Sequence, residues 1–309
     1  MEPTETLTDS DLWPRHHGGV QVGVIDVGSN TVRLLVASDG EPVAQRRAIL
    51  GLGAAIEEYG SIPEPKLAEV TDCVAEWVKV ARRNHVERLE VLVTSPGRQA
   101  ANGHELLERL ATASRVPVRL LSGAEEGRLA FLGALARTRV RHDDAVAVCD
   151  VGGGSAQITV GTRDDGPAWT RSIDIGSRRL ASRCFTDDPP GPDAVRAAGE
   201  AVAPYLEGLV FPVPKTAIAV GGSARSLKKI VGGSLGRKEL ARALDVLATT
   251  PADELAERYD LDPGRLSTLA AGAVILAAIQ ERLDLALRVG RGGVREGAVV
   301  ELTARAVAA

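Results

Sequence analysis

The sequence predicts an α/β protein made of two related domains, and three observations lead to this fold class. The chain has 309 residues, which is long enough for two domains of ordinary size. After an opening hairpin pattern, its first part alternates strand and helix patterns, as layered α/β domains do. The hairpin pattern then returns at an offset of 124 residues, where Asp150 falls on Asp26. We interpret this repeat as a duplicated domain.

The first half opens with an apolar, β-rich run over residues 20–36 that the turn Asp26–Asn30 interrupts, which predicts a β-hairpin. A helix follows over residues 65–84, because its apolar residues recur at helical spacing and Pro65 stands near its start. The remaining elements are predicted as a strand at 89–94, a helix at 103–114, a strand at 116–121 and a helix at 124–136.

The second half opens with the repeated hairpin over residues 145–160, in which Gly152 falls on Gly28 and Val160 on Val36. Later residues predict a turn at 165–168, strands at 169–175 and 216–220, a helix at 193–206 and a helix ending near Ile230. The chain closes with an almost wholly apolar, buried helix over 266–283 and an amphipathic helix over 295–309. We therefore expect a disordered tail at 1–19, a first domain at 20–136 and a second at 137–309, whose last helix packs back on the first.

Composition narrows the classes of protein. The formal net charge is −4, which argues against a dedicated duplex-DNA binder, so no nucleic-acid partner is expected. We find no segment with the roughly 20 apolar residues of a membrane helix and no apolar signal segment near the start. The three cysteines, Cys73, Cys149 and Cys184, form no CxxC pair. Neither a membrane partner nor a disulfide framework is expected, and the cytoplasm is the natural location.

Three glycine-rich turns, each following an apolar strand, carry the candidate chemistry. Small residues at such turns let successive N–H groups point at one spot, and this arrangement binds anions. Asp26 and Asp150 end the strands before the first two turns, and paired acids beside phosphate-binding loops favour Mg²⁺, with Mn²⁺ as the alternative. Walker A and Gly-x-Gly-x-x-Gly motifs are absent from the sequence. The predicted phosphate-binding residues are Gly28, Ser29, Asn30, Thr31, Gly152, Gly153, Gly154, Ser155, Gly221, Gly222 and Ser223.

Taken together, these motifs resemble the exopolyphosphatase and guanosine pentaphosphate phosphohydrolase family. This family belongs to the superfamily of acetate and sugar kinases, actin and heat-shock chaperone ATPases. The resemblance covers about residues 20 to 309 and is closest to the short, two-domain exopolyphosphatases. It rests on six segments in order: Ile25–Leu34, Thr94–Asn102, Ser122–Leu129, Asp150–Ser155, Gly221–Leu227 and Val294–Gly297.

The resemblance implies two duplicated ribonuclease H-like (actin-like ATPase) domains with the active site in the cleft between them. It also implies that Glu126 is the base that activates water, and our hypothesis adds Arg33 and Arg98 as side chains that grip phosphate oxygens. From the residues alone, a Glu-Glu pair in the first turn of a helix is more often a partner of the helix dipole. Asp150, helped by Asp26, would place Mg²⁺, and inorganic polyphosphate or pppGpp would be the substrate.

Two departures from the family pattern stand out. Gln157 occupies a position that is usually Glu, which removes a charge near the expected metal, and residues 265–270 lack the expected acidic pattern.

Homodimers are frequent among short members, so a homodimer is a further expectation. A polyanion also needs a cationic path, and the candidates are Arg46, Arg47, Arg82, Arg83, Arg178, Arg179, Lys228, Lys229 and Arg291.

Four functions stay open at this point. Exopolyphosphatase leads, and pppGpp 5′-phosphohydrolase is its alternative within the family, although no clear aromatic platform for a nucleoside is visible. The third is a sugar or acetate kinase-like transferase, for which Leu269–Ala273 could be an adenosine motif, although helix packing is the commoner meaning of such residues. The fourth is a non-catalytic phosphate or nucleotide sensor, which Gln157 suggests.

Overall fold

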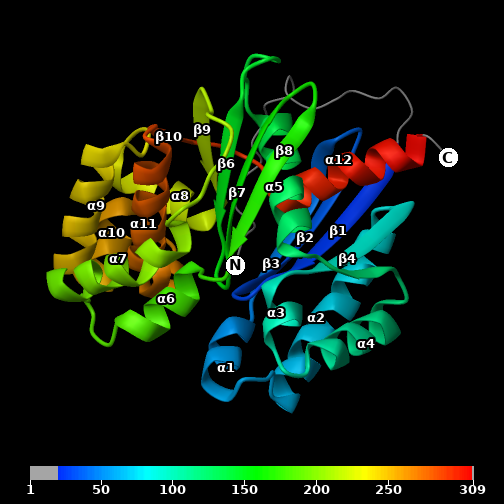
Figure 1. Ribbon diagram of the computed structural model, residues 1–309. Coiled ribbons are helices and arrows are strands. Elements are labelled where there is room, and N and C mark those ends of the chain that lie inside the picture. Colours follow the sequence, from blue (N-terminus) through cyan, green and yellow to red (C-terminus); the bar gives the residue numbers. More distant parts are fainter. Residues whose placement is uncertain (1–19, 308–309) are drawn as a thin grey trace.

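The computed structural model describes residues 20–307, so the predicted tail at 1–19 lies outside the described residues (Figure 1). The first sheet has the strand order β3-β2-β1-β4-β5 and the second has β10-β9-β6-β7-β8. The first sheet consists of β1 (Gln21–Val27), β2 (Thr31–Ser38), β3 (Glu41–Ile49), β4 (Arg88–Val93) and β5 (Val118–Leu120). The second consists of β6 (Val146–Val151), β7 (Ala156–Thr162), β8 (Gly166–Ile173), β9 (Thr216–Val220) and β10 (Leu287–Val289).

The two sheets repeat one plan, as the sequence repeat predicts. In the first, β1, β2 and β3 form an antiparallel meander, and β4 and then β5 add in parallel on the other side of β1. In the second, β6, β7 and β8 form the meander, and β9 and β10 add in parallel beside β6. The register also repeats: Asp26 stands opposite Arg33 in the first hairpin, and Asp150 stands opposite Gln157 in the second. The hairpins are therefore equivalent residue by residue.

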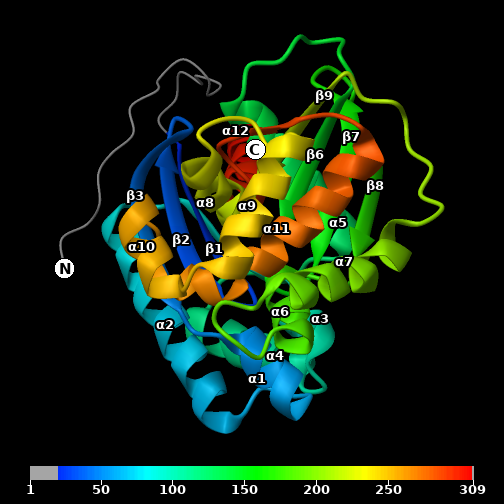
Figure 2. The same cartoon turned by 90° about the vertical axis from the view of Figure 1, so that its left-hand side faces the viewer.

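Helices cover the outer face of each sheet. The apolar sides of α2 (Glu64–Arg83) and α4 (Gly103–Ser114) pack on the first sheet. A larger layer covers the second sheet, and α9 and α11 lie in front of it in Figure 2. This layer is formed by α6 (Ser177–Cys184), α7 (Pro192–Leu206), α8 (Gly221–Val231), α9 (Arg237–Thr249), α10 (Ala252–Tyr259) and α11 (Pro263–Leu283).

Two helices lie side by side between the sheets: α5 (Gly123–Arg137) and α12 (Val294–Val307) (Figure 1). Helix α12 packs on β1, and α5 contributes apolar residues to both sheets. Their backbones touch, since a Cβ on Gly133 would stand 2.0 Å from the carbonyl oxygen of Gly293. The last helix thus lies on the first sheet, although it follows the second in the chain.

Helix α11 qualifies the expectation that no segment resembles a membrane helix. By length and composition it is apolar enough to cross a bilayer, but 72% of its apolar window is buried inside the fold. It is also the helix that the sequence predicts as buried, and α6, α7, α8 and α9 surround it. We interpret α11 as the core helix of the second half.

Several elements are absent from the sequence prediction: β3, α1 (Leu52–Tyr59), α3 (Ser95–Gln99), α6, α9, α10 and β10. The turn predicted at 165–168 is shorter than expected, since β8 already begins at Gly166 and ends at Ile173 rather than at residue 175. Pro167 is tolerated there because β8 is an edge strand of its sheet. The helix after β9 starts at Gly221, so the third glycine turn is the first turn of α8.

Candidate active site

The three glycine turns meet in one cleft with an empty volume of about 1100 Å³, part of which is open to solvent. Of the predicted site residues, only Arg98 and Gly154 do not line this cleft, and both stand directly behind its wall. The predicted residues that line it are Asp26, Gly28, Ser29, Asn30, Thr31, Arg33, Glu126, Asp150, Gly152, Gly153, Ser155, Gly221, Gly222 and Ser223.

The first two turns are built alike. The N–H of Gly28 donates to the carbonyl of Thr31 at 3.1 Å, and the N–H of Gly152 donates to the carbonyl of Ser155 at 3.0 Å. The turns also approach each other, because a Cβ on Gly154 would stand 2.6 Å from the Ser29 hydroxyl oxygen. Glycine is therefore needed there for close approach, and the two turns lie next to each other in the cleft.

Glu126 stands in the first turn of α5, where Ser122 and Glu125 form a capping box. Its side chain is buried, and its Oε2 accepts a hydrogen bond from Nη2 of Arg98 at 2.9 Å. Burial raises the pKa of Glu126 to about 7, against the opposing effect of Arg98. Such a pKa suits a general base at neutral pH.

Arg98 connects this carboxylate to the second turn. Besides Glu126, its guanidinium donates to the Ser155 hydroxyl at 3.2 Å and to the Leu121 carbonyl at 2.6 Å. Ser155 also accepts from Nε2 of Gln157 at 3.0 Å, and the Oε1 of Gln157 is buried without a hydrogen-bond partner. Glu126, the second turn and Gln157 thus belong to one polar network.

Asp26 and Asp150 lie at the ends of equivalent strands and line the cleft. Burial raises the pKa of both carboxyls, that of Asp150 to about 6, and the charge of each raises the pKa of Glu126. Within residues 20–307, no group of three or more His, Cys, Asp and Glu side chains forms a protein-only metal cage. Two desolvated carboxylates beside an anion-binding cleft fit Mg²⁺, which takes one or two carboxylates plus waters and phosphate oxygens.

Five arginines line the same cleft beside its four acidic residues. Arg33, Arg225 and Arg265 line it, and neither Arg33 nor Arg225 has a hydrogen bond or close ion pair with any residue the structure describes. Burial, together with the nearby charges of Arg295 and Arg265, lowers the pKa of Arg33 to about 9. Burial likewise lowers the pKa of Arg265 to about 10 and depresses that of Arg225. Arg265 lies 3.7 Å from Asp262, whereas the unpaired guanidiniums of Arg33 and Arg225 are typical of an anion site.

Several residues that line the cleft are not among the site residues predicted from the sequence: Arg225, Arg265, Arg295, Glu296, Thr94 and Ser95. Arg225 and Arg295 stand inside motifs that carry the family resemblance, so that signal was available. Arg265 had no such signal. Its guanidinium lies against Gly222, where a Cβ would stand 1.6 Å from its Nη1.

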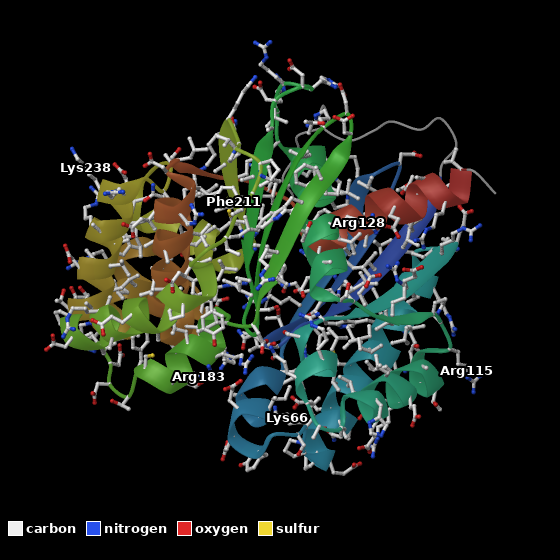
Figure 3. The ribbon with its side chains drawn as sticks, viewed as in Figure 1. Lys66, Arg115, Arg128, Arg183, Phe211 and Lys238 are labelled. Carbon is white, nitrogen blue, oxygen red and sulfur yellow. The ribbon has the colours of Figure 1, made fainter. Side chains whose placement is uncertain are left out.

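Most candidates for the cationic path lie outside the cleft, so the path itself stays a prediction. Arg178 lines the cleft, and the other candidates do not. Arg179 pairs with Glu57 at 2.7 Å, and Lys229 pairs with Asp260 at 2.7 Å. Arg115 and Lys238, which are not among these candidates, lie at the edge of the molecule (Figure 3). The other arginines that line the cleft, Arg33, Arg225, Arg265 and Arg295, have no basic neighbour in the sequence.

The segment Leu269–Ala273 lies inside α11 and is almost wholly buried. Gly272 faces α8, because a Cβ there would stand 2.5 Å from the hydroxyl oxygen of Ser223. These small residues let two helices approach closely, which supports the helix-packing interpretation of this segment.

Comparison with known proteins gives a consistent result. The Ppx/GppA phosphatase family model matches residues 35–306. Exopolyphosphatase 1 of Mycobacterium tuberculosis is 27% identical over 303 residues, covering 91% of this chain and 88% of that protein. Exopolyphosphatase 2 of the same organism is 25% identical over 292 residues, covering 85% of this chain and 91% of that protein.

Solved structures agree with the fold. The Ppx/GppA family member from Aquifex aeolicus superposes with a TM-score of 0.79 at 27% identity, covering 93% of this chain and 98% of that one. A Cytophaga hutchinsonii exopolyphosphatase has a TM-score of 0.80 at 21% identity, covering 91% and 97% of the two chains, which shows the shared fold. The predicted fold of two duplicated actin-like domains is confirmed, and the chain belongs to the Ppx/GppA phosphatase family.

Proposed function

We propose that this protein is an exopolyphosphatase, which hydrolyses terminal phosphoryl groups from inorganic polyphosphate and releases orthophosphate. One observation carries the proposal: the buried carboxylate of Glu126 shares a cleft with two adjacent glycine turns and the unpaired guanidiniums of Arg33 and Arg225. The names of the similar mycobacterial proteins support the same activity.

In this proposal, the N–H groups of the turns at 28–31 and 152–155 hold the terminal phosphate, and Arg33 neutralises its oxygens. Arg98 holds one oxygen of Glu126, so the other is free to accept a proton from water. The water oxygen bonds to phosphorus as the P–O anhydride bond breaks, and the shortened chain leaves with the bridging oxygen. Phosphoryl transfer depends mainly on such positioning and charge compensation.

A divalent cation is part of the proposal, with Asp150 and Asp26 as its protein ligands. When bound, Mg²⁺ or Mn²⁺ supplies charge neutralisation on the phosphate oxygens. Gln157 replaces the carboxylate usual in the family, so this site carries one negative charge fewer. We therefore expect this site to bind its divalent cation more weakly than a site with the usual carboxylate.

Substrate choice favours inorganic polyphosphate over pppGpp. Among the described residues that line the cleft, none is aromatic, so a guanine base would lack a stacking platform there. The buried arginines offer contacts to further phosphates of a chain.

We also infer a cytoplasmic location, because Cys73, Cys149 and Cys184 are free thiols. Homodimerisation stays a proposal based on the family resemblance.

The test is a phosphate-release assay with polyphosphates of defined length and with pppGpp, each in Mg²⁺ and in Mn²⁺. Glu126→Gln should lower the turnover of polyphosphate by about 100-fold or more while binding persists. Glu108→Gln makes the same charge change on an exposed position of α4 and should have no effect. Binding without phosphate release in any metal would identify a sensor instead, and preferential turnover of pppGpp would replace polyphosphate as the substrate.

A further inference from the structure

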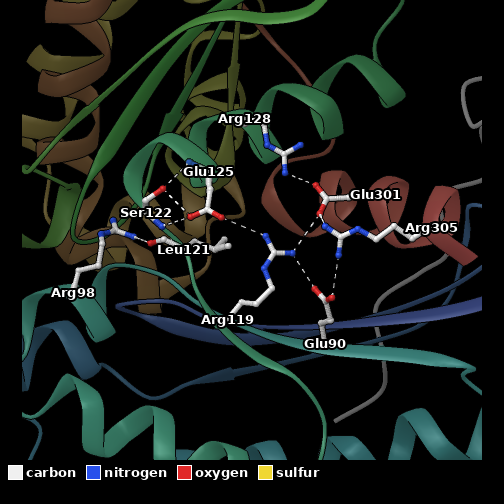
Figure 4. Close-up of polar contacts among 9 residues, drawn as sticks. All are labelled: Glu90, Arg98, Arg119, Leu121, Ser122, Glu125, Arg128, Glu301 and Arg305. Atoms are coloured by element: carbon white, nitrogen blue, oxygen red, sulfur yellow. Dashed lines mark hydrogen bonds and ion pairs between the residues drawn. The ribbon is translucent and has the colours of Figure 1, made fainter.

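Behind the catalytic helix lies an ionic network that the proposed chemistry does not use. It contains three arginines and three glutamates from four elements, so its formal charges balance (Figure 4). Arg119 on β5 is its centre, and its guanidinium lies 3.2 Å from Glu90 on β4, 3.3 Å from Glu301 on α12 and 3.6 Å from Glu125 on α5. Glu301 also accepts from Arg128 on α5 and from Arg305 on α12.

The centre of the network is better shielded than an ordinary surface ion pair, whereas the side chain of Glu125 is 43% exposed. The side chains of Glu90 and Glu301 are 12% and 14% exposed, and that of Arg119 is 26% exposed. Exposed pairs contribute little because water screens them, whereas partly buried, multiply bonded charges fix geometry more firmly. Arg119 is therefore placed to hold its partners rigidly.

The link to the reaction passes through Glu125. Its Oε2 accepts from the N–H of Ser122 at 2.9 Å, and its own N–H donates to the Ser122 hydroxyl at 3.2 Å, which closes the capping box. Its Oε1 faces Arg119. Glu126 is the next residue, and consecutive helix residues point in different directions, so Glu125 faces the network while Glu126 faces the cleft. Any tilt of this first turn moves the Glu126 carboxylate.

The first turn of α5 has contacts in both halves of the molecule. Helix α5 packs against β7 and β8 of the second sheet, but Arg98, the partner of Glu126, belongs to α3 beside the first sheet. The first turn of α5 must therefore keep its place relative to the first sheet. Residues 121–122 join β5 directly to α5, and α5 also packs on the core of the first sheet. Arg119 on β5 adds an ionic contact to the first turn of α5.

We propose that Arg119 is a positioning residue for Glu126, acting through the Glu125 cap to hold the first turn of α5 against the first sheet. This inference rests on the proposed function, in which Glu126 is the base. Arg119 touches no substrate, so its loss should reduce the rate of the chemical step and leave polyphosphate binding nearly unchanged.

The test compares two matched variants. Arg119→Gln should lower kcat for polyphosphate about 10-fold, with KM within twofold, because small misplacements of a catalytic group are costly. Arg119→Lys restores the charge and should recover most of the lost kcat. Arg305→Gln removes another arginine of the same network that pairs with Glu90 and Glu301, and it should leave kcat unchanged. Thermal unfolding of all variants separates loss of stability from loss of rate.

A crystal structure of Arg119→Gln makes the inference independent of the substrate. It should show the 2.9 Å contact between Arg98 and Glu126 broken, whatever the protein hydrolyses. If that contact persists, or if Arg119→Gln and Arg305→Gln lower kcat equally, Arg119 has only a structural role. If the wild type releases no phosphate from polyphosphate while the contact breaks in the variant, the proposed function fails and the positioning role stands.

Discussion

At the scale of single residues, the pKa of Glu126 gives a directly measurable pH dependence. Burial raises this pKa to about 7, and a general base must be unprotonated to accept a proton from water. We therefore expect kcat/KM for polyphosphate to rise as the pH increases through about 7 and to level off above it. Arg98 opposes the upward shift, so Arg98→Met should move this rise to higher pH. A pH–rate profile that is flat from pH 5 to 8.5 would contradict the assignment.

Arg33 illustrates a second consequence at this scale, a conflict between stability and binding. Its guanidinium is buried and unpaired within the described residues, and burial holds its pKa at about 9, which means that the fold disfavours its charge. Arg33→Met should therefore raise the Tm at pH 7 and weaken polyphosphate binding by roughly 10-fold to 100-fold, since a charge-assisted contact is lost. Arg115→Met, on an exposed helix end, is the matched control and should change neither quantity. A lower Tm for Arg33→Met would show that the charge is compensated in the free protein.

At the scale of elements, sequence patterns predicted the repeated hairpins and the long helices, because these bury regular apolar faces. Strand β3 was missed because it is an exposed edge strand that carries Pro42, Arg46 and Arg47 and pairs only with β2. Helix α9 did carry a signal, the helical spacing of Leu240, Ala243 and Leu247, which went unused. Short elements such as β10 have three residues and depend on their neighbours, so local sequence could not specify them.

The contact between α5 and α12 yields a prediction at the same scale. A Cβ on Gly297 would stand 1.9 Å from the carbonyl oxygen of Leu129, and backbone atoms cannot move aside as a flexible side chain can. Gly297→Ala should therefore lower the free energy of unfolding by about 3 kcal/mol, measured by urea denaturation. Gly199→Ala on α7 has no atom within 4 Å of the new Cβ and should instead stabilise the protein by about 0.5 to 1 kcal/mol. Similar effects of both substitutions would rule out close packing as the cause.

At the scale of the whole molecule, the site could be predicted only in part from the sequence. The first two glycine turns and both aspartates could be predicted from the sequence, because the duplication repeats one motif 124 residues later. Arg225 and Arg265 come from α8 and α11, and their meeting over the third turn depends on how the helices pack. No local pattern encodes that juxtaposition, and most of the adjacent basic residues in the sequence lie outside the cleft.

The same arrangement predicts how the protein responds to salt. The chain has a net charge of −4, so long-range attraction of a polyanion cannot come from its overall charge. We infer that the attraction comes from the arginines gathered in the cleft. When these arginines neutralise phosphate charges, polyphosphate releases its counterions. We expect the dissociation constant of long-chain polyphosphate to rise steeply with ionic strength, and the salt slope to fall by about one in Arg265→Met. Lys238→Met removes a cationic side chain that lies at the periphery and should leave the slope unchanged. Binding that is independent of salt, or equal slopes in the two variants, would mean that the chain binds elsewhere than in the cleft.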